Sequence, residues 1–175
     1  MSVVRTLLPV VLGALSAASP AAAQVEVVER SIVELQEAMA SGRATSVQIT
    51  RAYLDRIEAY DRRGPALNAM VWLSPTALEE AAALDRERTQ RGPRGPIHGI
   101  PVILKDNYDT HDLPTTAGTL ALAGHIAPDD AFQVTRLRAA GAVILGKANM
   151  HELASGITTI SSMGGQTLNP YDLAR

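Results

Sequence analysis

Residues 95–110 read Gly-Pro-Ile-His-Gly-Ile-Pro-Val-Ile-Leu-Lys-Asp-Asn-Tyr-Asp-Thr, and this stretch decides the fold. The apolar run Ile100–Leu104 passes straight into Lys105 and Asp106, with no turn residue between them. Such a run is typical of a strand that is buried on both faces of an α/β sheet. Open α/β sheets build their sites beyond the carboxyl ends of their strands, so Lys105 is either an ordinary strand-end charge or a catalytic base.

A second apolar run, Ala142–Leu145, follows the same pattern and leads into Lys147. Between the two runs, Asp129 and Asp130 can cap a helix that ends at Gly141. A strand, a helix and a strand in this order predict a parallel pair of strands with a right-handed crossover. The expected fold class is therefore α/β.

The region before residue 92 predicts helices only. Ser31 with Glu34, and Thr45 with Gln48, have the spacing of capping boxes and predict two helix starts. Ser74, followed by a proline, predicts the start of a third helix. We expect these helices to pack around another part of the fold, with their charges on the solvated side.

Residues 1–23 have the layout of a secretory signal peptide. Arg5 provides the positive start, Leu7–Leu15 an apolar segment that is short for a membrane span, and Ala21-Ala22-Ala23 the cleavage site. We expect export to the periplasm or the extracellular space, a mature chain of residues 24–175, and no membrane span after cleavage. An uncleaved N-terminal anchor is the alternative.

The composition of the chain argues against several classes of function. A chain of 175 residues with 46% hydrophobic content suits one globular domain. A net charge of −2, with 3% aromatic residues and no basic stripe, argues against nucleic-acid binding. The chain has no cysteine, which excludes disulfides, a thiolate zinc site and a cysteine nucleophile.

Two further patterns predict no cofactor and no metal. Gly141–Lys147 matches the letters of a phosphate-binding loop, but Ala148 replaces the required hydroxyl residue and the intervening residues favour a strand. The four histidines lack the spacing of metal ligands, so we expect surface or hydrogen-bonded side chains. They are His98, His111, His125 and His151.

Several separate blocks together resemble the amidase signature family, in the order in which that family carries them. These blocks are Gly95–Asn107, Pro114–Gly118, Leu137–Ala154 and Gly164–Asp172. The resemblance is dense from about residue 31 to residue 175. It implies a mixed β-sheet core flanked by helices, truncated here to its N-terminal part, in which normally interior strands would have open edges.

The resemblance also implies a Ser–cis-Ser–Lys hydrolase that cleaves the C–N bond of a small-molecule amide through an acyl-enzyme. By the family's motif, Lys105 is the catalytic lysine. A lysine acts as a base only when it is neutral, so we expect burial to lower its pKa and Asp106 to point away from it or to be satisfied by backbone donors. Met150, which follows the second strand, is the candidate substrate-binding residue.

In the family, both serines follow the block that resembles Gly164–Asp172. Ser161 and Ser162 precede this block, so they do not match those serines, and the 175-residue polypeptide alone is expected to be inactive. Two other interpretations remain open: an A-type component of an amidotransferase that acts on misacylated tRNA, and a non-catalytic interaction module derived from the amidase fold. The signal peptide argues against the former, and neither the amide substrate nor the oligomeric state is specified.

Overall fold

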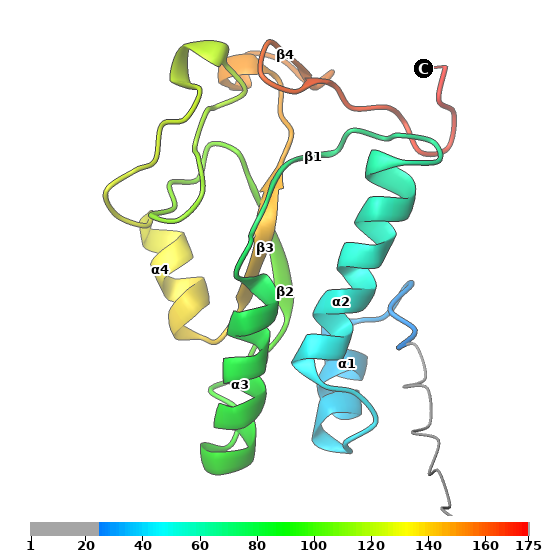
Figure 1. Ribbon diagram of the computed structural model, residues 1–175, viewed down its shortest axis with the longest axis vertical. Helices are drawn as coiled ribbons and strands as arrows, with labels where there is room; N and C mark the ends of the chain where they lie inside the picture. Colours follow the sequence, from blue (N-terminus) through cyan, green and yellow to red (C-terminus); the bar gives the residue numbers. More distant parts are fainter. Residues whose placement is uncertain (1–24, 175) are drawn as a thin grey trace, which may run out of the picture.

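The computed structural model describes residues 25–174, and the predicted signal peptide lies outside them. A three-stranded mixed sheet forms the centre, with helices on both faces (Figure 1), which confirms the predicted fold class. The helices are α1 (Ile32–Ala40), α2 (Ser46–Ile57), α3 (Ala77–Arg91) and α4 (Phe132–Ala139), with a π-helical turn at Glu58–Arg62 and short 3-10 turns at Leu120–Leu122 and Glu152–Ala154. The strands are β1 (Met70–Leu73), β2 (Pro101–Lys105), β3 (Val143–Ala148), β4 (Ile160–Ser161) and β5 (Gly165–Gln166).

Strand β3 is the centre of the sheet, because the strand order is β1-β3-β2. Strand β2 runs parallel to β3, so that Leu104 pairs with Lys147 and Lys105 pairs with Ala148. Strand β1 runs antiparallel to β3 on its other side. The parallel pair connected through α4 confirms the strand–helix–strand prediction, and it brings the carboxyl ends of β2 and β3 to one edge of the sheet.

The two faces of β3 are covered by different helices. On one face, Val143 and Leu145 pack against α3 through Ala81. On the other face, Ile144 packs against Val134 of α4. Because successive side chains of a strand point to opposite faces, this alternation buries β3 on both sides.

Strand β2 is covered on one face only, which corrects the prediction for the run at residues 100–104. Leu104 is buried, whereas Ile103 is 46% exposed and Lys105 is also exposed. Within residues 25–174, no strand pairs with the outer edge of β2. The stretch expected to be buried on both faces therefore lies half open.

Both predicted capping boxes form. Ser31 accepts a hydrogen bond from the N–H of Glu34, and the Glu34 side chain accepts one from the N–H of Ser31. Thr45 and Gln48 make the same pair of bonds at the start of α2. Helix α3 begins at Ala77, two residues later than the proline predicts, and neither α3 nor α4 has a side-chain cap. The predicted cap of α4 is therefore wrong.

Strand β1 lies in the region for which only helices were predicted. Four residues are too few for a two-residue period to show in the sequence, and pairing with β3 decides the conformation. After β3, the chain forms the small β4–β5 hairpin beyond the carboxyl ends of β2 and β3 (Figure 1). Among residues 25–174, no helix is long and apolar enough to cross a membrane.

Candidate active site

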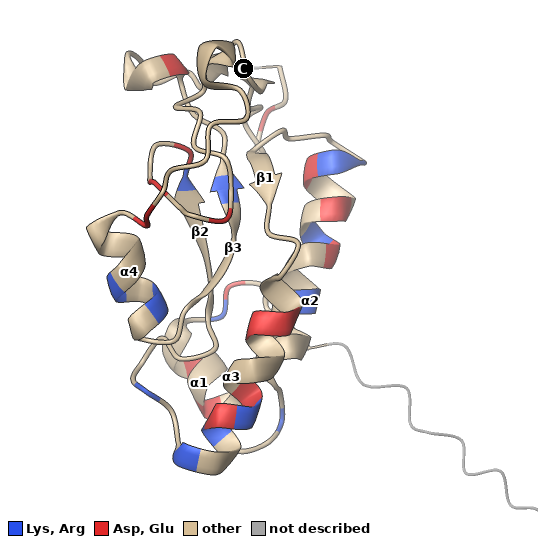
Figure 2. Cartoon of the chain, turned by 60° about the vertical axis from the view of Figure 1, so that its left-hand side comes forward, with Lys and Arg blue, Asp and Glu red and all other residues tan. Residues whose placement is uncertain are grey.

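Lys105 ends strand β2, at the edge of the sheet where β3 also ends (Figure 2). Its side chain is exposed, and it forms no hydrogen bond or ion pair with any other residue in the range 25–174. An open groove of about 630 Å³ lies beside it, lined by β2, Tyr108 and the α4 residues Phe132 and Leu137 among others. The predicted lysine thus stands at an accessible strand end, but these residues do not supply the burial expected for it.

Asp106 is the neighbour of Lys105, yet it is fully buried. Its Oδ2 accepts hydrogen bonds from the hydroxyl and from the backbone N–H of Thr116. Its own N–H donates to the carbonyl of Ala148 at 3.1 Å, and its carbonyl accepts from the N–H of Ala117 at 2.9 Å. As expected, Asp106 forms no ion pair with Lys105, and its Oδ2 is bonded to backbone and hydroxyl donors, whereas its Oδ1 has no hydrogen-bond donor among residues 25–174.

Lys147 is the residue of this site that the sequence reasoning missed. Its side chain, on β3, is fully buried. Nζ donates hydrogen bonds to the carbonyls of Tyr108 at 2.7 Å and Pro114 at 3.1 Å, and to Oγ1 of Thr115 at 2.8 Å. Oδ1 of Asp106 lies 3.9 Å from Nζ. Lys147 therefore belongs to a buried polar network directly behind the turn that follows β2.

Burial lowers the pKa of the Lys147 ammonium, and the carboxylate of Asp106 opposes this shift. The sequence signal for such a residue is a lysine inside an apolar strand, since β3 is buried from Val143 to Lys147. A lysine in that position must find its acceptors inside the protein, because a buried charge without partners is strongly unfavourable. The match of Gly141–Lys147 to the letters of a phosphate-binding loop directs attention away from this indication.

Met150, the candidate substrate-binding residue, is 2% exposed. It does not line the groove beside Lys105. Ser161 is buried too, and its Oγ accepts a hydrogen bond from the N–H of Gly164 and donates one to Oδ1 of Asn149. The N–H of Ser162 donates to Glu152. The hydrogen bonds of Ser161 and Ser162 therefore stabilise the β4–β5 region, and the role predicted for Met150 stays a prediction.

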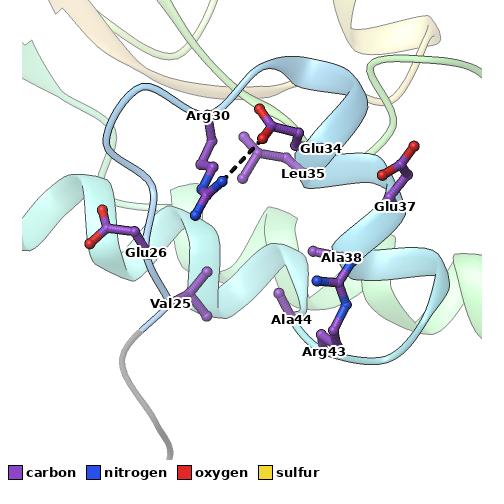
Figure 3. Close-up of a pocket in the computed structure, with 9 residues that line it drawn as sticks. All are labelled: Val25, Glu26, Arg30, Glu34, Leu35, Glu37, Ala38, Arg43 and Ala44. Carbon is purple, nitrogen blue, oxygen red and sulfur yellow. Dashed lines mark hydrogen bonds and ion pairs between the residues drawn. The ribbon is translucent and has the colours of Figure 1, made fainter.

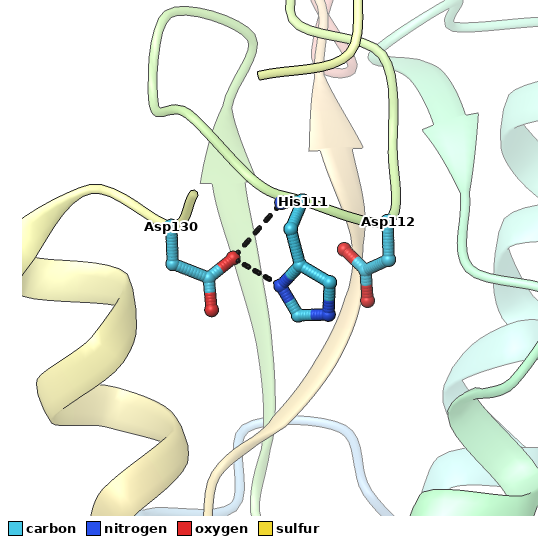
Figure 4. A group of neighbouring side chains, drawn as sticks. All are labelled: His111, Asp112 and Asp130. Carbon is cyan, nitrogen blue, oxygen red and sulfur yellow. Dashed lines mark hydrogen bonds and ion pairs between the residues drawn. The ribbon is translucent and has the colours of Figure 1, made fainter. Parts of the chain in front are cut away.

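His111, Asp112 and Asp130 form a group in the loops before α4 (Figure 4). Oδ1 of Asp130 accepts hydrogen bonds from the N–H of His111 at 3.0 Å and from its Nδ1 at 2.8 Å. The guanidinium of Arg138, on α4, lies 3.0 Å from Asp130 and 2.7 Å from Asp112. The ligand types would suit a metal, but an arginine already neutralises both carboxylates, so an ion-pair cluster describes this group better.

A separate hollow of about 390 Å³ lies beside α1 (Figure 3), at the end of the molecule away from the tips of β2 and β3. Its wall carries apolar side chains such as Leu35, together with negatively charged carboxylates and positively charged guanidinium groups. Arg30 and Glu34 on this wall pair with each other at 3.0 Å. Nothing on its wall combines a base with a nucleophile, so we assign it no catalytic role.

The chain is similar to known proteins over most of its length. A family model described as amidase matches residues 48–175. The A-type component of the glutamyl-tRNA(Gln) amidotransferase of Acidothermus cellulolyticus is 42% identical over 151 residues, which cover 86% of this chain and 29% of that protein. The native peptide amidase of Stenotrophomonas maltophilia matches in structure with a TM-score of 0.80 and 49% identity, over 84% of this chain and 31% of that one.

An amidase family protein of Bacillus anthracis gives a TM-score of 0.79 and 40% identity, over 84% of this chain and 30% of that one. The chain therefore spans about 30% of the length of the relatives it matches.

Proposed function

The chain belongs to the amidase signature family, and from this premise we propose that Lys105 is the catalytic lysine of an enzyme that hydrolyses a carboxamide. In this reaction a serine attacks the amide carbonyl, the C–N bond breaks with release of the amine or ammonia, and water resolves the acyl-enzyme to a carboxylic acid. Lys105 accepts and returns the proton that passes between the serines. The serines and the oxyanion-hole donors belong to the part of the family domain that follows the block resembling Gly164–Asp172.

The observation that supports this role most is that the side chain of Lys105 forms no ion pair with an acid among residues 25–174. Its side chain lies at the carboxyl end of β2 and has no ion-pair partner among residues 25–174, while the adjacent Asp106 is buried and bonded to Thr116. A lysine held next to a carboxylate would stay protonated and could not accept a proton. The groove beside it offers space for a substrate.

Replacement of Lys105 in the native protein tests the proposal. Activity is read as ammonia release from a peptide amide, an aryl amide and a long-chain fatty amide. We expect Lys105→Met to lower kcat by about a hundredfold to ten-thousandfold, the usual contribution of a general base. Arg51→Ala, at an exposed position of α2, is the control and should retain activity. Undiminished turnover by Lys105→Met would overturn the assignment.

The polypeptide of residues 24–175 is a second arm of this test. It holds Lys105 but no serine at the family's position, so we expect it to release no ammonia from any of the three amides, since nucleophile and oxyanion donors supply most of the rate in acyl transfer. Hydrolysis by this polypeptide that is abolished by Lys105→Met would show that the nucleophile lies within these residues.

We also propose that the protein is exported and cleaved after Ala23. The expected mature N-terminus is Gln24, which intact-mass measurement of the periplasmic or secreted protein would identify. The same measurement distinguishes an exported amidase from the main alternative, a cytoplasmic amidotransferase component. The amidotransferase relatives favour a component that transfers ammonia to misacylated tRNA, a reaction of the cytoplasm. A cytoplasmic protein that retains residue 1 or 2 and supports such transfer would favour that function over ours.

A further inference from the structure

The ammonium of Lys147 connects the centre of the sheet to three points of one loop. Lys147 lies on β3, where it pairs with Leu104 of β2. Its three hydrogen-bond acceptors all belong to the segment that follows β2, at Tyr108, Pro114 and Thr115. One side chain therefore ties the whole loop of residues 108–115 to the strand beside it.

The same loop begins with the turn that carries Lys105. The N–H of Tyr108 donates to the carbonyl of Lys105 at 3.0 Å, which closes the turn. The carbonyl of Tyr108 accepts the 2.7 Å hydrogen bond from Lys147. The turn from Lys105 to Tyr108 is thus held by its own hydrogen bond and, from the buried side, by Lys147.

Asp106 completes this support inside the turn. One carboxylate oxygen is bonded to Thr116. The other, Oδ1, has no hydrogen-bond donor among residues 25–174 and lies 3.9 Å from Nζ of Lys147. Two opposite charges buried at this distance compensate each other, whereas either one alone would be strongly destabilising.

We propose that Lys147 is a positioning residue for Lys105. It fixes the turn of residues 105–108 from the buried side, while the side chain of Lys105 extends on the open side toward the groove. This inference rests on the proposed role of Lys105 as the base. A buried ammonium has a desolvation cost that an apolar side chain of similar size lacks, so what Lys147 adds is its three hydrogen bonds to the loop. A displacement of about 1 Å of a catalytic group can lower a rate about a hundredfold.

The test compares four variants in the native protein, with whichever of the three amides it hydrolyses fastest. For each variant, kcat and KM are measured separately, and the midpoint of thermal unfolding is recorded. We expect Lys147→Met to lower kcat by about tenfold to a hundredfold, with KM changed by less than about threefold, because the base is displaced while the substrate groove remains. This variant is also expected to be less stable, because it leaves Asp106 buried without a counter-charge.

The double variant Lys147→Met/Asp106→Asn separates positioning from stability. It leaves no unpaired buried charge, so its unfolding midpoint should recover relative to Lys147→Met. Its kcat should stay low, because the carbonyls of Tyr108 and Pro114 still lack their donor. Recovery of kcat together with stability would overturn the inference and leave the role of Lys105 intact.

A milder pair of variants decides the question if Lys147→Met does not fold. Thr115→Val keeps both charges and removes two hydrogen bonds of the loop, the one from Lys147 to Thr115 and the one from Oγ1 of Thr115 to the carbonyl of Tyr108 at 3.2 Å. We therefore expect kcat to fall by about threefold to tenfold. Thr110→Val is the matched control, since the buried hydroxyl of Thr110 bonds to the carbonyl of Leu113 and not to Lys147. Equal kcat values for these two variants would overturn the inference. Lys105→Met is assayed in parallel, and retained activity there would overturn the proposed function itself.

Discussion

Lys105 and Asp106 are adjacent in sequence and lie in opposite environments: the side chain of Lys105 is exposed, and that of Asp106 is completely buried. The end of strand β2 produces this separation, because successive side chains point to opposite faces. The base candidate is thereby kept away from the carboxylate adjacent to it in sequence, and that carboxylate bonds to Thr116 in the loop behind the turn. The predictions below follow from this arrangement and from the packing around it.

The two lysines of the chain should differ strongly in chemical reactivity. In the native protein, an amine-acetylating reagent should modify Lys105, and activity should fall in parallel. Lys147 should stay unmodified until denaturant is added, because its side chain is fully buried and donates three hydrogen bonds. Mass spectrometry of peptides at increasing reagent concentration measures both sites, and equal rates of acetylation would contradict the buried position of Lys147.

Gly146 should be intolerant of a side chain, because the backbone of β1, which pairs antiparallel with β3, lies very close to this residue. A Cβ at position 146 would collide with the carbonyl oxygen of Trp72 and lie 3.1 Å from Cα of Leu73. We expect Gly146→Ala to destabilise the native protein by about 1–3 kcal/mol, as overpacking does. Gly95→Ala is the control, since nothing lies within 4 Å of its Cβ position. Urea denaturation of both variants gives the comparison, and equal midpoints would contradict this packing.

Asp130→Asn should destabilise the protein in a pH-dependent way. Partial burial raises the pKa of Asp130, but the hydrogen bonds from His111 and the charge of Arg138 outweigh it, so the net pKa is lowered. A lowered carboxyl pKa contributes stability above the ordinary value of about 4, and this contribution is lost as the pH falls through the folded-state pKa.

At pH 7 we therefore expect Asp130→Asn to lower the free energy of unfolding by about 1.5–3 kcal/mol, the range for hydrogen bonds to a charged group. The difference in the free energy of unfolding between Asp130→Asn and the unmodified protein should become smaller below about pH 4. Asp129→Asn, at the exposed neighbouring position, should have little effect at either pH. A difference that is independent of pH would show that the charge of Asp130 does not contribute.

The polypeptide of residues 24–175 should self-associate when it is expressed alone. The open side of β2 exposes Ile103, and Phe132 beside it is 75% exposed. An unpaired strand edge with an apolar surface is a site of association. Light scattering should show less association for the double variant Ile103→Lys/Phe132→Ser than for the unmodified polypeptide. The control Val33→Lys, which removes an exposed apolar residue of α1, should leave the association unchanged. A monomer with a sharp, reversible melt would contradict this expectation.

Local signals in the sequence were sufficient for part of the fold. The capping boxes at Ser31 and Thr45 depend on residues three positions apart, and the parallel pair of strands follows from two apolar runs around a helix. Strand β1 has no comparable signal, because it is four residues long and becomes a strand through its pairing with β3. The one-sided burial of β2 depends on which elements pack against it, and the order of residues does not contain that information.

In the candidate site, too, some residues are indicated by local sequence patterns and others only by the tertiary structure. A motif of consecutive residues predicts Lys105 as the catalytic lysine, and this role stays a prediction. No such motif indicates the network of Lys147, because its hydrogen-bond acceptors belong to residues 32 to 39 positions earlier in the chain. Asp130 was predicted to cap α4 and instead joins His111 to Arg138, since a partner from another loop competes successfully with the helix end.

The strand order β1-β3-β2 also has a consequence for the synthesis of the protein. Strands β1 and β2 leave the ribosome before β3, yet each of them pairs with β3 and not with the other. A nascent chain that has not yet released Val143–Ala148 therefore carries two strands without a partner and helices with no complete sheet to cover. Because β3 is the shared partner, neither β1 nor β2 can pair within this sheet until β3 is available.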